Sequence, residues 1–290
     1  MKKESTKIGF IGTGVMGNPM ASHILKEGYE LYVYNRTSAK TQSLVASGAH
    51  ACDSPGSVAE MCDIIFAIVG FPKDVETVFL GSNGIVEKAK PGSIIVDMTT
   101  STPDLAKKIA SVAIKKGLHS LDAPVSGGDV GAKSGMLSIM VGGKKEIFNR
   151  VLPLFELMGS NVVYQGSAGS GQHTKMANQI GIASSMLAMC ESLTYAKAAG
   201  LDQKTVLKSI SSGAAGSWSL TNLAPRILRD DYEPGFFVRH FIKDMQIAID
   251  SSEAMGIPIP GLKVAKAKFD QIADQGLDNK GTQAVIKAYE

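Results

Sequence analysis

Short apolar runs alternate with helix-like stretches along the first half of the chain. The runs are rich in β-branched residues and are bounded by Gly, Pro or polar residues, which is typical of buried strands. This alternation predicts βαβ units around a mostly parallel sheet that helices cover on both faces. The expected strands are Lys7–Ile11, Glu30–Tyr34, Asp63–Val69, Ser93–Met98, His119–Ala123 and Leu137–Val141. The expected helices between them include Met16–Glu27, Ala39–Ala46, Pro103–Lys116 and Lys144–Met158.

The pattern changes after Val162-Val163-Tyr164, beyond which strand signals cease. From Gly171 to Gly200, apolar residues recur at three- and four-residue steps without a proline, which predicts one long helix. Gly200 is the expected end of that helix, and Asp202 is the expected cap of the next. We therefore predict a doubly wound α/β domain over residues 1–166 and an all-helical domain over residues 167–290, joined by the long helix.

Composition narrows the class of protein. The 290 residues carry a formal net charge of +3 with 20% charged residues, and the basic residues form no block that would indicate nucleic-acid binding. The longest apolar run, near Ile64–Val69, is far shorter than a membrane helix requires, and we expect no signal peptide. Three scattered cysteines predict no disulfide framework, and no His/Cys/Asp cluster predicts a metal. We expect a cytoplasmic protein.

Three glycines follow the first expected strand in the pattern G-x-G-x-x-G: Gly12, Gly14 and Gly17. A strand before the pattern and a helix after it give the motif its mechanism: a tight turn, close approach of the backbone to a pyrophosphate, and N–H groups at a helix N-terminus. The alternative is an ordinary glycine-rich turn. We predict a dinucleotide cofactor held by residues Gly12, Thr13, Gly14, Val15, Met16 and Gly17.

The second expected strand ends in Asn35-Arg36-Thr37, where many NAD-binding domains place Asp or Glu. Asn35 is neutral and does not repel a 2′-phosphate, Arg36 can pair with one, and Thr37 adds a hydroxyl donor. Alternatively, Arg36 is a solvated loop residue and Thr37 caps the following helix. We predict a preference for NADP over NAD.

Later loops at strand ends offer further contacts. Val69 and Thr100 follow two buried strands and are expected to line the cofactor crevice, although turn or cap roles are alternatives. Ser126-Gly127-Gly128 follows another strand and combines a hydroxyl with exposed backbone N–H groups. Such a turn can hold a carboxylate or phosphate, but by itself it can equally be a plain loop.

Lys175, Asn178 and Gln179 lie near the start of the long helix. Their spacing places the three side chains on one helix face. A partly desolvated lysine near a helix N-terminus loses its proton more readily, which suits a general acid or base. The alternative is a solvated surface lysine.

Four ordered segments together resemble the β-hydroxyacid dehydrogenase family, which includes 3-hydroxyisobutyrate dehydrogenase and several semialdehyde reductases. They are Gly9–Met20, Asp122–Gly128, Gly169–Gln179 and Phe241–Met245, and they span essentially the whole chain. The resemblance implies a Rossmann domain, a helical domain on a long interdomain helix, and reversible NAD(P)-linked oxidation of a small β-hydroxy acid.

The resemblance also implies residue roles. Lys175 matches the catalytic lysine, Ser126, Gly127 and Gly128 match the substrate-carboxylate cradle, and Thr100 and Lys243 match cofactor contacts. Many members have Asn four residues after the lysine, where this chain has Gln179, so either Gln179 or Asn178 is expected to orient the substrate. Trp218, Phe237 and Arg239 are candidate specificity residues, although Trp218 can equally belong to the core.

Two further expectations concern the whole chain. Family behaviour and the apolar long helix indicate a homodimer or homotetramer. The alternative function is a catalytically inactive nucleotide sensor or scaffold, which the retained Lys175 and Ser126-Gly127-Gly128 disfavour.

Overall fold

The computed structural model describes residues 3–290. The chain divides into two compact units, Met1–Lys175 and Met176–Glu290, and the long helix α9 (Ser170–Ala198) begins in the first unit and continues in the second. Each unit has its own buried apolar core. The expectation of an α/β first part and an all-helical second part is confirmed.

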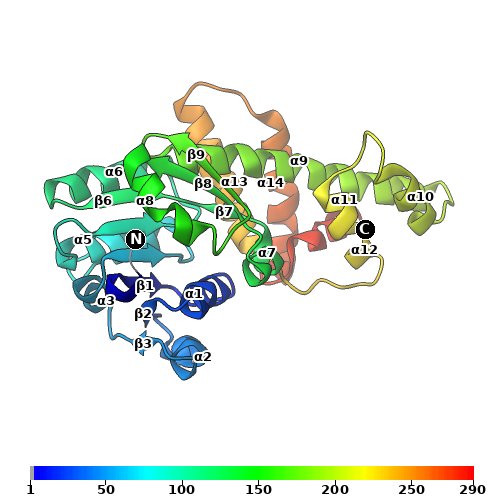
Figure 1. The fold of residues 1–290 in the computed structure, drawn as a ribbon. Coiled ribbons are helices and arrows are strands. Elements are labelled where there is room, and N and C mark those ends of the chain that lie inside the picture. The colour runs from blue at the N-terminus through cyan, green and yellow to red at the C-terminus, as the bar shows by residue number, and fades with distance from the viewer. Residues whose placement is uncertain (1–2) are drawn as a thin grey trace. The chain divides into compact units, whose positions relative to one another are not determined.

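The first unit is built on one sheet in the order β3-β2-β1-β4-β5-β6-β8, and β7 and β9 also pair with β8 (Figure 1). Every pairing from β3 through β6 is parallel, whereas β8 runs antiparallel to β6 and β7 and parallel to β9. The mostly parallel sheet is therefore confirmed. The strands are β1 (Lys7–Ile11), β2 (Glu30–Tyr34), β3 (His50–Ala51), β4 (Ile64–Ala67), β5 (Ile94–Asp97), β6 (His119–Asp122), β7 (Val125–Ser126), β8 (Ser138–Gly143) and β9 (Asn161–Gly166).

Helices cover both faces of this sheet, as alternating strand residues show. Phe10 and Phe66 point to the face packed by α1 (Gly17–Lys26) and α8 (Lys145–Phe155). Ile11 and Ile65 point to the opposite face. The helices that cover this face are α3 (Pro55–Met61), α4 (Pro72–Leu80), α5 (Ile85–Lys88) and α6 (Pro103–Lys115). The central strands β4 and β5 are buried at every position, because a strand with helices on both sides has no solvated face.

Local sequence signals explain where the helices of the first unit begin. Pro103 starts α6 (Pro103–Lys115), and the Thr102 hydroxyl accepts a bond from the Leu105 N–H at 3.2 Å. The expected helix Ala39–Ala46 is two pieces in the structure, the 3₁₀ turn η2 (Ser38–Thr41) and α2 (Gln42–Ala46). The other elements are η1 (Lys3–Ser5), α3 (Pro55–Met61), α4 (Pro72–Leu80), α5 (Ile85–Lys88) and α7 (Gly128–Ser134).

The second unit is entirely helical. Gly200 follows α9 with a φ of 72°, and the Asp202 carboxylate accepts a bond from the Thr205 N–H at the start of the next helix, so both expected caps are confirmed. Phe241 and Phe269 pack edge to face in the centre of this unit, at 5.0 Å between ring centroids. Its remaining elements are α10 (Gln203–Ile210), α11 (Trp218–Asn222), α12 (Ala224–Ile227), α13 (Val238–Ala254), α14 (Pro260–Ile272), η3 (Ala273–Leu277) and η4 (Thr282–Tyr289).

Over residues 3–290, no helix combines the length and the apolar character that crossing a membrane requires. The same part of the chain contains no group of three or more His, Cys, Asp or Glu residues arranged to hold a metal ion.

Candidate active site

The predicted cofactor residues of the first unit lie along one edge of the sheet. Strands β2, β1, β4, β5 and β6 are mutually parallel, so the loops that leave their C-terminal ends lie along the same edge. These loops carry the glycine motif, Asn35, Val69, Thr100 and the turn toward Ser126. In an open α/β sheet, the crevice outside the carboxyl ends of the strands is where nucleotides bind.

Two of the three motif glycines are required by the protein's own backbone. Gly12 has a φ of +91°, and a Cβ there would lie 2.0 Å from the Ile68 carbonyl oxygen. A Cβ at Gly17 would lie 1.8 Å from the Gly12 carbonyl oxygen. Neither position can hold another residue without moving the backbone, because these separations are far below van der Waals contact. Gly12 makes the turn after β1, and Gly17 lets α1 begin directly against it.

Gly14 differs because its Cβ position faces open space, with nothing within 4 Å. The fold alone therefore does not require glycine at this position. A Cβ here would occupy the space through which a pyrophosphate approaches the backbone N–H groups at the start of α1. The motif thus fits a dinucleotide. Beside Gly14, Thr13 is buried, Val15 is exposed and Met16 is half-buried.

The end of β2 is tied to the glycine turn through Asn35. Its Oδ1 accepts a bond from the Thr13 N–H at 3.0 Å, and its Nδ2 donates to the Thr37 carbonyl at 2.9 Å. Asn35 therefore holds the turn in shape in addition to being uncharged. Thr37 precedes η2, but its side chain makes no capping bond, so the alternative role as a side-chain cap is not supported.

Arg36 extends into solvent next to this turn. Its side chain is 86% exposed, and its guanidinium lies 3.2 Å from Asp74 Oδ1 at the start of α4. An exposed ion pair of this kind contributes little stability. The guanidinium is consequently accessible to an anionic ligand near the C-terminal end of β2, where Rossmann domains contact the ribose of the cofactor.

The loops after β4 and β5 are joined by Thr99. The Val69 N–H donates to the Thr99 hydroxyl at 2.9 Å, and the Thr99 N–H donates to Asp97 Oδ1 at the same distance. Thr99 is buried, whereas the neighbouring Thr100 is half-buried. Thr99 therefore stabilises the loop through its hydrogen bonds, whereas Thr100 lies closer to the surface.

The predicted anion cradle is a glycine-dependent turn between β7 and α7. Gly127 and Gly128 have φ angles of 132° and 62°, which residues other than glycine rarely adopt. Gly127 is exposed and precedes α7, whose first turn receives no side-chain cap. Ser126 is half-buried at the end of β7. The residues present therefore suit recognition of a carboxylate by backbone N–H groups and a hydroxyl.

The start of α9 is held at the ends of β5 and β6 by a buried polar network. Asp122, the last residue of β6, accepts bonds from the N–H groups of Gly169 at 2.8 Å and Gln172 at 2.9 Å. Burial raises the pKa of the Asp122 carboxyl above its ordinary value, although these backbone donors oppose the rise. Lys175 follows one turn later and is only 6% exposed. It is a buried residue, so the alternative of a solvated surface lysine is not supported.

The sequence predictions assigned no role to Asp122 or Gln172. A carboxylate at the end of a strand is the weak signal that identifies Asp122 in retrospect, because a buried charge requires partners. Gln172 carries no such signal, since one polar residue among several at a helix start is ordinary.

In the second unit, the two candidate amides are linked to each other. Gln179 is 1% exposed and donates to Asp244 Oδ2 at 2.6 Å, and Asn178 donates to Gln179 Oε1 at 2.7 Å. The ammonium of Lys243 lies 3.0 Å from the other oxygen of Asp244. Asp244 is thus a buried anchor for two predicted site residues, and the sequence predictions gave it no role. The Gln179 amide donates to Asp244 and accepts from Asn178. Asn178 is half-buried, and its bond to Gln179 uses Nδ2 and does not involve Oδ1.

The proposed specificity residues lie at or near helix starts in the second unit. Trp218 begins α11 and is 62% exposed, so the alternative that it belongs to the core is wrong. The Arg239 guanidinium lies 4.7 Å from the centre of the Phe237 ring and bonds to Asn279.

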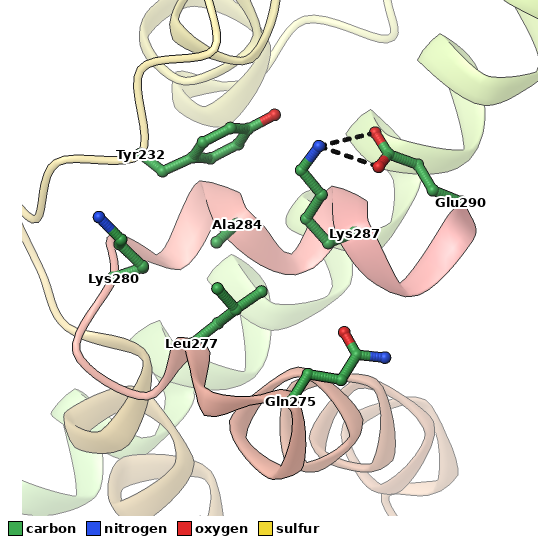
Figure 2. Close-up of a pocket in the computed structure, with 7 residues that line it drawn as sticks. All are labelled: Tyr232, Gln275, Leu277, Lys280, Ala284, Lys287 and Glu290. Atoms are coloured by element: carbon green, nitrogen blue, oxygen red, sulfur yellow. Dashed lines mark hydrogen bonds and ion pairs between the residues drawn. The ribbon is translucent and has the colours of Figure 1, made fainter.

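A separate surface pocket in the second unit contains none of the predicted site residues (Figure 2). Its volume is about 350 Å³, and Lys287 within it pairs with Glu290 at 2.9 Å while lying over the Tyr232 ring. Lys280, on the same pocket wall, has its ammonium 3.7 Å from Glu233. Both lysines have acidic partners, so the pocket offers no specific attraction for an anionic substrate.

Two family models match nearly the whole chain. Residues 7–166 match the NAD binding domain of 6-phosphogluconate dehydrogenase, and residues 169–289 match the model described as NAD-binding of NADP-dependent 3-hydroxyisobutyrate dehydrogenase. The first model covers the sheet with its glycine motif, and the second covers the helical part.

Relatives and solved structures agree with these models. An uncharacterized oxidoreductase, YkwC of Bacillus subtilis, is 56% identical over 97% of this chain and 98% of its own. The 2-hydroxy-3-oxopropionate reductase of Escherichia coli is 37% identical over 98% and 97%. The structure of Mycobacterium tuberculosis 3-hydroxyisobutyrate dehydrogenase with L-serine matches 98% of this chain and 99% of its own, with a TM-score of 0.90 and 25% identity. The chain belongs to the β-hydroxyacid dehydrogenase family and is an NAD(P)-dependent oxidoreductase.

Proposed function

We propose that this enzyme interconverts a small β-hydroxy acid and its semialdehyde or oxo acid, with Lys175 as the general acid and base. The observation that carries the proposal is the burial of Lys175 in the second turn of α9, a helix anchored at the ends of β5 and β6. Burying an ammonium is costly, so a buried lysine at this edge of a nucleotide-binding sheet is a candidate for a role in the reaction.

The chemistry divides between the cofactor and the chain. When bound, the nicotinamide supplies a hydride for reduction or accepts one in oxidation. In the direction of reduction, the carbonyl carbon gains the hydride and the carbonyl oxygen takes a proton from the Lys175 ammonium. The C=O group thus becomes CH–OH, and the lysine is left neutral. In the direction of oxidation, neutral Lys175 takes the hydroxyl proton.

We assign recognition of the substrate carboxylate to Ser126, Gly127 and Gly128. The positive φ angles of the two glycines and the uncapped start of α7 support this assignment. The name of the E. coli relative gives it a substrate of the same chemistry, a carboxylate with an oxo group on its third carbon. Of the two amides, we assign substrate orientation to Asn178, because the Gln179 amide is engaged by Asp244.

We also propose that NADP is the preferred cofactor. Arg36 is exposed at the end of β2, and no Asp or Glu occupies positions 35–37, where a carboxylate would repel a 2′-phosphate. The match of residues 169–289 to an NADP-dependent dehydrogenase model supports the same choice.

The decisive experiment replaces Lys175 with Ala and assays a panel of semialdehydes and 2-oxo acids with NADPH and NADH. Loss of a general acid is expected to lower kcat by roughly 10²–10⁴, while the dissociation constant for NADPH changes little. Lys107→Ala, which removes an exposed lysine paired with Asp104, serves as the control. If the Lys175 variant keeps most of the wild-type kcat, the proposed role is excluded.

A further inference from the structure

Gln172 makes more buried hydrogen bonds than its position on a helix requires. Its side chain is fully buried, its Nε2 donates to the Thr99 carbonyl at 2.7 Å, and its Oε1 accepts from the Ser101 N–H at 3.0 Å. Its own N–H donates to Asp122 at 2.9 Å. One residue thus bonds to the loop after β5 and to the end of β6.

The loop that Gln172 grips carries Thr100, which lies between its two bonding partners. The Gln172 side-chain amide bonds only to backbone atoms of this loop. It therefore fixes the path of the backbone through residues 99–101 independently of their side chains. Thr99 in turn bonds to the N–H of Val69 after β4. A shift of Gln172 would therefore be transmitted to two loops at the cofactor edge of the sheet.

The helix that carries Gln172 also carries Lys175. The two residues are three positions apart in α9, so about one helical turn separates them. Because a helix is rigid over one turn, the bonds of Gln172 fix the start of α9 relative to the loop at residues 99–101. Asp122 secures the same helix start through the N–H groups of Gly169 and Gln172.

We propose that Gln172 is a positioning residue that holds the loop carrying Thr100 at a fixed distance from Lys175, and thereby aligns hydride transfer with proton transfer. The inference rests on the proposed role of Lys175. An apolar side chain of similar length would fill the same space but could bond neither group, whereas the amide bonds both a carbonyl and an N–H of this loop. A displacement of about 1 Å between reacting groups can cost a hundredfold in rate.

The test compares Gln172→Met, which cannot make either bond, with Gln172→Glu. We expect Gln172→Met to lower the single-turnover rate of hydride transfer at saturating NADPH and substrate by about tenfold or more. The dissociation constant for NADPH should change by less than about threefold, because the glycine motif is untouched. In cofactor-free protein, hydrogen exchange at the Ser101 amide should become faster, because this N–H loses its acceptor.

Gln172→Glu provides a signature that a purely structural role would not produce. A protonated carboxyl can donate to the Thr99 carbonyl and accept from the Ser101 N–H, whereas a carboxylate cannot donate. Relative to wild type at each pH, the hydride-transfer rate of this variant should rise as the pH falls. The corresponding ratio for Gln172→Met should stay flat.

Gln283→Met is the matched control, since Gln283 is likewise buried, at 1% exposed, and donates to the Asp231 carbonyl at 2.9 Å and to the Glu233 carbonyl at 3.2 Å. It is expected to lose stability without losing hydride-transfer rate. A wild-type transfer rate in Gln172→Met, or unchanged exchange at Ser101, would overturn the proposal. Activity retained by Lys175→Ala would instead overturn the proposed function, and the exchange measurement in cofactor-free protein would still report on the Gln172 bonds.

Discussion

At the scale of single residues, Arg36 is the side chain on which cofactor choice depends. Its guanidinium is exposed at the end of β2 and forms a solvent-exposed ion pair with Asp74. Charge-assisted bonds to a phosphate are worth about 1.5–3 kcal/mol, and exposure to solvent places Arg36 at the lower end. We expect wild type to favour NADPH over NADH in kcat/KM and Arg36→Ala to reduce that ratio roughly tenfold.

Lys116→Ala is the control for this change, because it removes one exposed positive charge, paired with Glu87, at the end of α6. It should leave the ratio unaltered. A wild-type ratio below one, or a ratio that does not respond to Arg36→Ala, would contradict NADP preference.

How well single residues could be predicted depended on whether their chemistry is visible in sequence. The motif glycines stand out through their spacing after a strand, and Lys175 stands out through its match to the catalytic lysine of the family that the chain resembles. Gln172 and Asp244 do not, because their importance comes from partners 71 and 65 residues away in the chain. The distinction between Thr99 and Thr100 likewise required knowing which hydroxyl the Val69 N–H reaches.

At the scale of elements, the turn from β7 into α7 tests the carboxylate cradle. Gly127→Ala places a methyl group in the exposed turn and strains a backbone with a φ of 132°. The strain costs roughly 1–2 kcal/mol. We expect KM for the acid to rise severalfold, with a smaller change in NADPH binding measured by fluorescence titration.

Gly131→Ala is the matched control for Gly127→Ala, because the added Cβ would contact Leu137 Cδ2 at 3.3 Å, compared with 3.2 Å for a Cβ at position 127. Gly131 lies inside α7 and its φ is not positive. Its alanine variant therefore makes the same contact with Leu137 without the backbone strain expected of Gly127→Ala. If both variants show the same KM, the turn does not bind the substrate.

A second element-scale prediction concerns acid stability of the segment between α12 and α13. Arg226 forms two bonds to Asp231, at 2.8 and 2.9 Å, and they lower the pKa of the Asp231 carboxyl from 3.8 to about 2. A lowered pKa means that the ionised carboxylate stabilises the fold above pH 3.8 and that this contribution disappears as the pH falls through about 2. Asp231→Asn should unfold at a lower temperature than wild type near pH 5, and the gap should close on acidification. A gap independent of pH would contradict the prediction.

Element bounds followed from sequence where the apolar pattern was strong. Lys7–Ile11 and Glu30–Tyr34 match β1 and β2 at both ends, and β4, β5 and β6 differ only at their ends. Short elements were missed. Helix α5 has four residues and β7 has two, too few to establish a period, so only contacts with the rest of the unit define them.

At the scale of the whole molecule, the expected homodimer or homotetramer is a prediction that measurement of mass can check. The second unit exposes several large apolar side chains, and subunit association would remove such surface from water. They include Tyr195, Leu201, Trp218, Met255, Ile257 and Val264. Sedimentation velocity is expected to give two or four times the chain mass of 30.5 kDa, whereas a single-chain mass at micromolar concentration would contradict it.

The open space in front of Gly14 has a consequence for experiments in cells. Alanine at this position meets no atom of the protein, so the variant should fold as well as wild type while its methyl group keeps the pyrophosphate away. The same change at Gly12 or Gly17 would damage the fold itself. Gly14→Ala is therefore expected to act as a separation-of-function allele that retains the folded polypeptide and loses the redox reaction. Any phenotype that this allele rescues in a deletion strain belongs to the protein's presence and not to its turnover.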